Sequence, residues 1–201
     1  MGFVSILSQK SDKIVIFPRN KPFGTLFVID KSEYNYLKER RITMNFNNFT
    51  IKAQEAVQEA VNLTQAHNGQ VIEPIHLLQA VMKVGENVTK FIFQKLGVNG
   101  QQIANVVARQ IESLPKVSGG NPYLSRESND VLQKAVQYSK EMGDEFVSIE
   151  PIILALLVVK STASSILKDA GVSEKELREA INELRKGERV TSQSSEDTYQ
   201  S

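Results

Sequence analysis

An internal repeat is the feature that most constrains the fold of this 201-residue chain. The run Ile72-Glu73-Pro74-Ile75 recurs as Ile149-Glu150-Pro151-Ile152, 77 residues later (149 − 72). Thr50 and Ser125 lie 75 residues apart (125 − 50), and each precedes a helical apolar pattern that its hydroxyl can cap. Two copies of one helical unit predict a domain in which neighbouring repeats bury a common core.

Apolar residues at helical spacing divide each copy into four helices, with Pro, Gly and capping residues between them. In the first copy we expect a helix from Thr50 to the Asn68-Gly69 turn, and further helices near 75–83, 87–96 and 100–113. The second copy repeats this order and ends with a helix over 174–186. The prediction is an all-α fold of two pseudo-twofold-related four-helix repeats, at 46–115 and 123–189, whose equivalent faces lie along a shared groove.

The residues on either side of this 44–189 domain differ in character. Residues 1–43 hold eight basic and four acidic residues, a net charge of +4 (8 − 4), whereas the other 158 hold 16 basic and 19 acidic, a net of −3 (16 − 19). Two apolar runs in this leader, at 13–17 and 25–29, predict strands of a short β-hairpin. Residues 190–201 are polar and aperiodic, which predicts a flexible linker.

The origin of the leader has three interpretations. Residues 38–41 are Lys, Glu, Arg and Arg, which purine-only codons can encode, as in a bacterial ribosome-binding site just before Met44. One hypothesis is therefore that residues 1–43 are a mis-started, non-native segment. The alternatives are a genuine N-terminal extension and an added segment. Peptides from 1–43 in protein purified from its native source would exclude the mis-start.

Composition and missing motifs exclude several chemistries. The chain has no Cys, and its two His residues, His67 and His76, lie on different predicted helices, so thiolate chemistry is excluded and no metal site is expected. It contains neither a phosphate-binding G-x-x-x-x-G-K-[ST] loop nor a G-x-S-x-G nucleophile motif. We therefore expect no catalytic residue, no metal and no cofactor in this chain, and no enzymatic activity.

Charge and hydropathy argue against two kinds of partner. The chain has 24 Lys and Arg against 23 Asp and Glu, and the repeat body is net negative. This argues against nucleic acid, although an all-α binder using the basic leader as an arm is one alternative. No apolar run reaches the roughly 18 residues of a membrane span, so no membrane partner is expected.

The ordered motifs of both repeats resemble a known family. They are Phe49-Thr50-Ile51-Lys52-Ala53-Gln54-Glu55-Ala56, Val71-Ile72-Glu73-Pro74-Ile75-His76-Leu77-Leu78 and Gly143-Asp144-Glu145-Phe146-Val147-Ser148-Ile149-Glu150-Pro151. Residues 44–189 resemble the N-terminal repeat domain of the Clp unfoldases, the AAA+ ring chaperones, and within them the ClpB-type disaggregases. The leader has no counterpart in the family pattern.

The resemblance implies a function in protein disaggregation and the stress response. It implies a cytoplasmic, substrate-recognition N-terminal domain that binds unfolded or aggregated polypeptide beside the AAA+ ring of its parent chaperone. ATP and magnesium would then belong to ATPase domains downstream, the parent would be a hexamer, and the isolated domain a monomer. A stand-alone Clp adaptor or regulator without ATPase domains is the main alternative. A small hydrolase is disfavoured by the missing motifs.

Six residues are candidates for polypeptide-substrate binding. Thr50, Asp144 and Glu150 match positions that the family links to substrate handling. Leu132, Ile149 and Pro151 would line the groove if the repeats pack as in the family. Each has a structural alternative: Thr50 as a helix cap, Glu150 as a partner of a helix dipole, Asp144 as a turn residue, and the other three as core.

Overall fold

The computed structural model describes residues 13–16, 27–30, 46–117 and 121–196, and the chain divides into two units, Met1–Asn45 and Phe46–Ser201. In the first unit, β1 (Lys13–Ile16) and β2 (Phe27–Asp30) pair antiparallel, with Lys13 opposite Asp30. These strands overlap the two apolar runs of the leader. The connection between them and the purine-codon segment at 38–41 lie outside the described residues.

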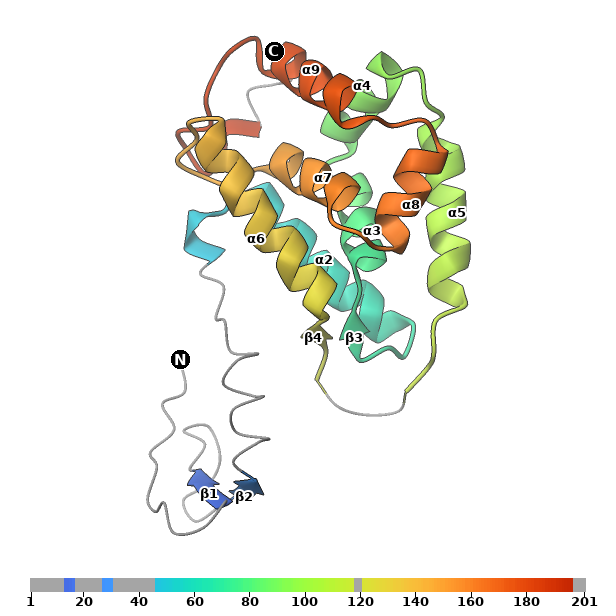
Figure 1. Ribbon diagram of the computed structural model, residues 1–201, viewed down its shortest axis with the longest axis vertical. Coiled ribbons are helices and arrows are strands. Elements are labelled where there is room, and N and C mark those ends of the chain that lie inside the picture. Colours follow the sequence, from blue (N-terminus) through green and yellow to red (C-terminus); the bar gives the residue numbers. More distant parts are fainter. Residues whose placement is uncertain (1–12, 17–26, 31–45, 118–120, 197–201) are drawn as a thin grey trace. The chain divides into compact units, whose positions relative to one another are not determined.

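The second unit consists mainly of α-helices (Figure 1). A short 3-10 helix, η1 (Phe46–Asn48), precedes the first repeat. The helices of repeat one are α2 (Ile51–Ala66), α3 (Pro74–Val84), α4 (Glu86–Lys95) and α5 (Gly100–Glu112). Those of repeat two are α6 (Arg126–Glu141), α7 (Ile149–Val158), α8 (Thr162–Asp169) and α9 (Glu174–Arg185). The predicted all-α fold with two four-helix repeats is confirmed.

Local sequence signals explain where these helices begin. The Thr50 hydroxyl accepts a hydrogen bond from the Ala53 backbone N–H at 3.2 Å, and the Ser125 hydroxyl accepts one from that of Ser128 at 3.0 Å. Each hydroxyl satisfies a backbone donor that the first helical turn leaves without a partner. Pro74 occupies the first position of α3, where the missing N–H costs nothing.

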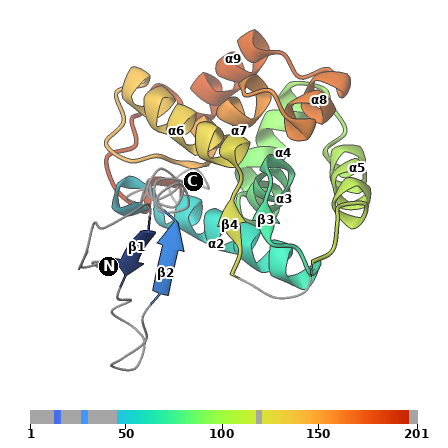
Figure 2. The ribbon, with the colours of Figure 1, turned by 60° about the horizontal axis from the view of Figure 1, so that its bottom comes forward.

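Short extended segments join the two repeats crosswise. β3 (Val71–Ile72), which leads into α3, pairs in parallel with β4 (Tyr123–Leu124), which leads into α6. Figure 2 shows this pair beside α2 and α6. The equivalent bridge on the other side joins Phe49, before α2, to Val147, before α7.

The backbone hydrogen bonds of these segments follow the same crossed pattern. The Thr50 N–H donates to the Val147 carbonyl at 2.9 Å, and the Ser125 N–H donates to the Ile72 carbonyl at 3.0 Å. Because Thr50 and Ser125 are equivalent, the two bonds are equivalent under the pseudo-twofold relation. Each repeat thus completes the start of the other repeat's first helix.

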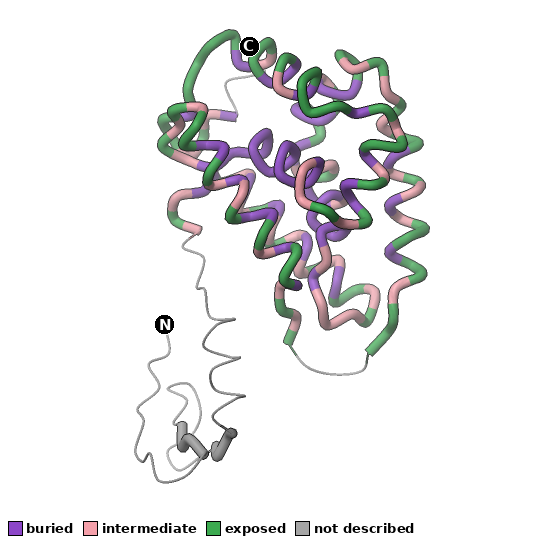
Figure 3. The backbone as a smooth tube through the Cα atoms, in the orientation of Figure 1, coloured by how far each residue is buried: buried purple, intermediate pink, exposed green. Residues whose placement is uncertain are grey.

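Helix α7 forms the centre of the core. All nine residues from Ile149 to Leu157 are buried, and Figure 3 shows the helix as a nearly continuous buried segment. It packs against α3, its equivalent in repeat one, and against α6, α8 and α9. The peripheral contacts also obey the repeat symmetry, because α4 packs on α9 and α5 packs on α8.

The apolar composition of α7 raises the question of a membrane span. Within the described ranges, no single helix is long and apolar enough to cross a bilayer. Helices α7 and α8 pass a length and composition test only as a pair, and they are bent by 92° relative to each other.

Residues 190–196, here called the C-terminal strap, differ from the predicted flexible linker. Val190 is fully buried and Glu196 is 3% exposed. The Gln193 carbonyl accepts a hydrogen bond from the Ile51 N–H at 2.8 Å, and its side-chain amide donates to the Asn47 carbonyl at 3.0 Å. The strap is held by backbone groups and one buried carboxylate, which hydropathy patterns do not register. Residues 197–201 of the predicted linker lie outside the described residues.

Candidate functional site

The six residues predicted to bind polypeptide are all buried. They comprise the N-cap Thr50 of α2, Leu132 within α6, Asp144 in the turn after α6, and Ile149, Glu150 and Pro151 in the first turn of α7. The structure brings the polar members close to one another around the start of α7. Because a buried side chain has no surface to offer a partner, their binding role stays a prediction that requires uncovering.

The guanidinium of Arg185 organises this cluster. Its Nε donates to Glu150 Oε1, its Nη1 to Asp144 Oδ2 and its Nη2 to the Ser148 hydroxyl, each at 2.9 Å. The side chains of Arg185, Asp144 and Glu150 are at most 4% exposed. Charged groups enter an interior only when paired and hydrogen-bonded. Arg185 therefore ties the end of α9 to the turn before α7.

Arg185 was missed in the sequence, where the charges of this last helix indicated a solvated face. Its position carries a signal nonetheless. It lies four residues after Ile181 and eight after Leu177, on the buried stripe of α9. A charged residue on the apolar stripe of an amphipathic helix predicts a buried partner of opposite charge.

Glu196 of the C-terminal strap completes the cluster from another direction. Its Oε1 accepts a hydrogen bond from the Ile149 N–H, the first of α7, at 2.8 Å. Burial, and then the charge of Glu150, raise the pKa of Glu196 to about 7, against the opposing effects of the Thr50 hydroxyl, the Ile149 N–H and Lys52. Among the described residues, Oε2 of Glu150 and Oε2 of Glu196 have no hydrogen-bond partner.

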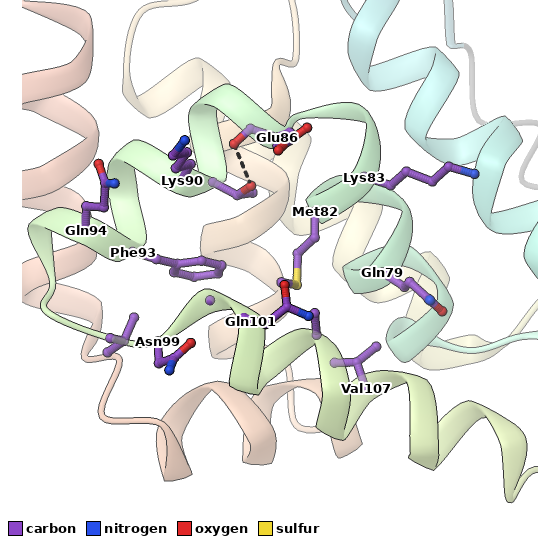
Figure 4. A pocket seen from close by; sticks show the side chains of 14 residues that line it. Gln79, Met82, Lys83, Glu86, Lys90, Phe93, Gln94, Asn99, Gln101 and Val107 are labelled. Atoms are coloured by element: carbon purple, nitrogen blue, oxygen red, sulfur yellow. Dashed lines mark hydrogen bonds between the residues drawn. The ribbon is translucent and has the colours of Figure 1, made fainter.

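An open groove lies elsewhere, between the three last helices of repeat one. It has a volume of about 670 Å³ and is lined by α3, α4 and α5. Figure 4 shows Phe93, Met82 and Gln101 pointing into it. Half-buried Met82, Val98 and Ala104 supply accessible apolar surface. The lining also includes the polar and charged residues Gln79, Lys83, Glu86, Lys90, Gln94, Asn99 and Gln101.

The predicted groove shared by the repeats corresponds to a smaller space. A cavity of about 380 Å³ lies between α5 of repeat one and α8 of repeat two. Its lining includes Ile103, Val106 and Ile166. None of the six predicted binding residues lines this cavity or the larger groove of repeat one.

The titratable residues of repeat one serve its local structure. His76 is buried, and its Nδ1 accepts a hydrogen bond from the Glu73 N–H at 3.0 Å, which closes a capping box at the start of α3. Burial above all, and then the charge of His67, lower the pKa of His76 to about 4. Within the part of the chain that the structure describes, no group of three or more His, Cys, Asp or Glu could hold a metal ion.

Comparison with known proteins defines the class. Residues 48–170 match the Clp repeat (R) N-terminal domain, and the chain belongs to this family. The match covers most of both repeats and agrees with their pairwise helix packing. The resemblance seen in the sequence motifs is thereby confirmed.

Two curated relatives specify the kind of chaperone. The chain is 80% identical over 158 residues to the chaperone protein ClpB of Bacteroides thetaiotaomicron, covering 79% of this chain and 18% of that protein. It is 56% identical over 156 residues to ClpB of Porphyromonas gingivalis, covering 78% and 18%. The chain thus spans about a fifth of the length of these relatives and corresponds to the N-terminal domain of a ClpB-type chaperone.

Solved structures share the fold. The N-terminal domain of Hsp104 from Candida albicans superimposes with a TM-score of 0.67 at 22% identity, covering 74% of this chain and 99% of that one. A ClpV N-domain in complex with a VipB peptide gives a TM-score of 0.59 at 16% identity, covering 73% and 92%. At these identities the likeness describes the architecture alone.

Proposed function

We propose that this chain is the substrate-recognition domain of an ATP-dependent disaggregase and that it binds unfolded or aggregated polypeptide. The observation that carries the proposal is the open, partly apolar groove between α3, α4 and α5 in a chain 80% identical to part of ClpB. The complex of the related ClpV N-domain with a peptide supports polypeptide as the ligand class.

The composition of the groove suits a transient client. Unfolded polypeptides expose apolar segments, which can bury surface against Met82, Val98 and Ala104. The polar rim, including Lys90 and Gln101, keeps the apolar area small. A small apolar area gives weak binding, and weak binding suits a domain that passes its client to a ring. A tether to that ring would raise the client's effective concentration there.

The six predicted residues form a second proposed contact region. Thr50, Asp144 and Glu150, with Leu132, Ile149 and Pro151, would contact a client only after the packing around the start of α7 opens. The AAA+ ring, its hexameric state and the use of ATP and magnesium are likewise proposals. The match to a limited part of a much longer chaperone supports this assignment over a stand-alone adaptor.

A matched pair of substitutions on α5 tests the groove. Ala104 lines it, whereas Ala108 is also half-buried but lies one turn further along the helix and outside the lining. We expect Ala104→Glu to weaken binding of a fluorescently labelled, unfolded casein at least about tenfold, because a carboxylate in the groove must be desolvated, at a cost above about 1.4 kcal/mol. Ala108→Glu should bind like the wild type.

Fluorescence anisotropy measures these affinities, and thermal unfolding checks that both variants fold. Equal affinities of Ala104→Glu and the wild type would exclude the groove as the client site. Absence of casein binding by the wild type would exclude the proposed function itself.

A further inference from the structure

The C-terminal strap lies on the residues that were predicted to bind a client. Glu196 contacts the Ile149 N–H at 2.8 Å and hydrogen-bonds to the Thr50 side chain. At the other end of the strap, the Val190 N–H donates to Asp144 Oδ1 at 3.0 Å. These three partners and Glu150, whose charge acts on Glu196, are four of the six predicted residues.

Burial of the four residues depends in part on this segment. Thr50, Ile149 and Glu150 have no exposed surface, and Asp144 has an exposed side-chain fraction of 0%. The strap also occupies backbone donors that an extended polypeptide would otherwise use, since the Gln193 carbonyl takes the Ile51 N–H and Glu196 takes that of Ile149. In chemical terms the strap is an extended peptide with one carboxylate, seated at two helix starts.

We propose that the C-terminal strap is a built-in cover, fixed by Glu196 at the start of α7, that must detach before a client polypeptide reaches Thr50, Asp144, Ile149 and Glu150. This inference rests on the proposed function and concerns the regulation of the same site. It explains how residues at a predicted contact region are buried in the chain as it stands.

Glu196 gives the cover a dependence on pH. The charged groups that face it are Glu150 on α7 and Lys52 on α2, while Asn87 on α4 and Leu184 on α9 line the adjoining cavity of about 120 Å³. Arg185 is engaged by Glu150 and Asp144 on the far side of Glu150. The attached strap therefore favours the protonated carboxyl of Glu196.

The sign of the effect follows from linkage. The pKa of Glu196 is about 7 in the attached strap against an ordinary 4.5, so the attached form binds more protons between these values. Attachment is strongest below about pH 4.5 and weakens as the pH rises through about 7. With these values, the ratio of attached to detached strap is about 30-fold greater at about pH 5.5 than at about pH 8.

Amide hydrogen exchange of the whole chain measures attachment directly. The reporters are the N–H groups of Ile149, Ile51 and Val190, which all form hydrogen bonds that attach the strap. After correction for intrinsic rates, we expect their protection to fall by up to about 30-fold from about pH 5.5 to about pH 8. The Thr50 N–H, which bonds to Val147, is the internal control and should keep its protection.

Two glutamines separate Glu196 from the general effect of charge. Glu196→Gln retains a hydrogen-bond acceptor but cannot ionise, so its three reporters should stay protected at both pH values. Glu188→Gln removes an exposed carboxylate just before the strap and should behave like the wild type. Equal wild-type protection at both pH values, or an unchanged pH response in Glu196→Gln, would overturn the proposal. The wild-type comparison needs no substitution, so the proposal remains testable if a variant does not fold.

Unfolded casein tests the role as a cover. At about pH 7, saturating casein should lower the protection of the Val190 N–H, because client and strap exclude each other. Binding detected by anisotropy with unchanged Val190 protection would overturn the cover. Absence of casein binding, with the expected pH response of the three amides, would instead overturn the proposed function and leave the Glu196 attachment standing.

Discussion

Replacing Arg185 by methionine is expected to destabilise the fold strongly. The substitution keeps most of the side-chain volume but removes the guanidinium that binds Glu150, Asp144 and Ser148, each at 2.9 Å. Both carboxylates have side chains with 0% exposure, so water cannot replace the lost donors without opening the structure. Breaking a buried ion pair by removing one partner costs about 3–5 kcal/mol.

The assay is thermal and chemical unfolding at about pH 7, followed by circular dichroism. For a domain of this size, about 3–5 kcal/mol corresponds to a melting temperature lower by about 6–20 °C. Arg178→Met is the matched control on the same helix. Arg178 forms an exposed ion pair with Glu174 and stacks on Tyr138 with its guanidinium carbon 4.8 Å from the ring centre, so its loss should cost about 1 kcal/mol.

A compensating variant tests the physical reason. The triple substitution Asp144→Asn, Glu150→Gln and Arg185→Met removes the buried charges together, and we expect it to recover at least about half of the lost stability, since buried polar pairs can be replaced at little cost. A deficit of less than about 1 kcal/mol in Arg185→Met would refute the reasoning. So would a triple variant less stable than the single one.

Two further predictions concern repeat one and its contact with repeat two. Between about pH 6.5 and about 4, where the depressed pKa of His76 makes the unfolded chain bind more protons, stability should fall with decreasing pH by about 3 kcal/mol more in the wild type than in His76→Gln, measured by urea unfolding; parallel curves would contradict this. Gly85→Ala places a Cβ 2.9 Å from Ile149 Cγ2 between α3 and α7 and should cost about 1–3 kcal/mol in the same assay. In Gly97→Ala the Cβ meets nothing within 4 Å, so only the backbone at φ +65° should count, at about 1 kcal/mol; an equal cost for both variants would contradict the packing argument.

The helices were predictable because their signals are local. Thr50 and Ser125 cap the helices that they were expected to cap, and Pro74 begins α3 as expected. Helix boundaries depend on which backbone groups lack partners within one turn, and the chain near each end supplies them. The all-α architecture followed from the repetition of this pattern after about 76 residues, a spacing between the observed offsets.

The interior around the start of α7 was less predictable because its contacts are distant in sequence. Arg185 meets Asp144 and Glu150 over separations of 41 and 35 residues, and Glu196 reaches Ile149 over 47. Polar side chains in a turn or tail carry no periodicity that reveals burial. The sequence therefore identified Asp144 and Glu150 as notable residues without their buried partner, and it suggested a linker where the strap packs.

The crossed hydrogen bonds between Thr50 and Val147 and between Ser125 and Ile72 make the two repeats thermodynamically inseparable. A polypeptide carrying one repeat would expose the face of α3 or α7 that packs on the other and would lack the carbonyl that completes its first helix. Such a half could recover both only by associating with a second copy, in the arrangement that the intact chain achieves within one molecule. The Phe46–Ser201 unit should accordingly melt in one cooperative transition, with no stage at which one repeat survives the other.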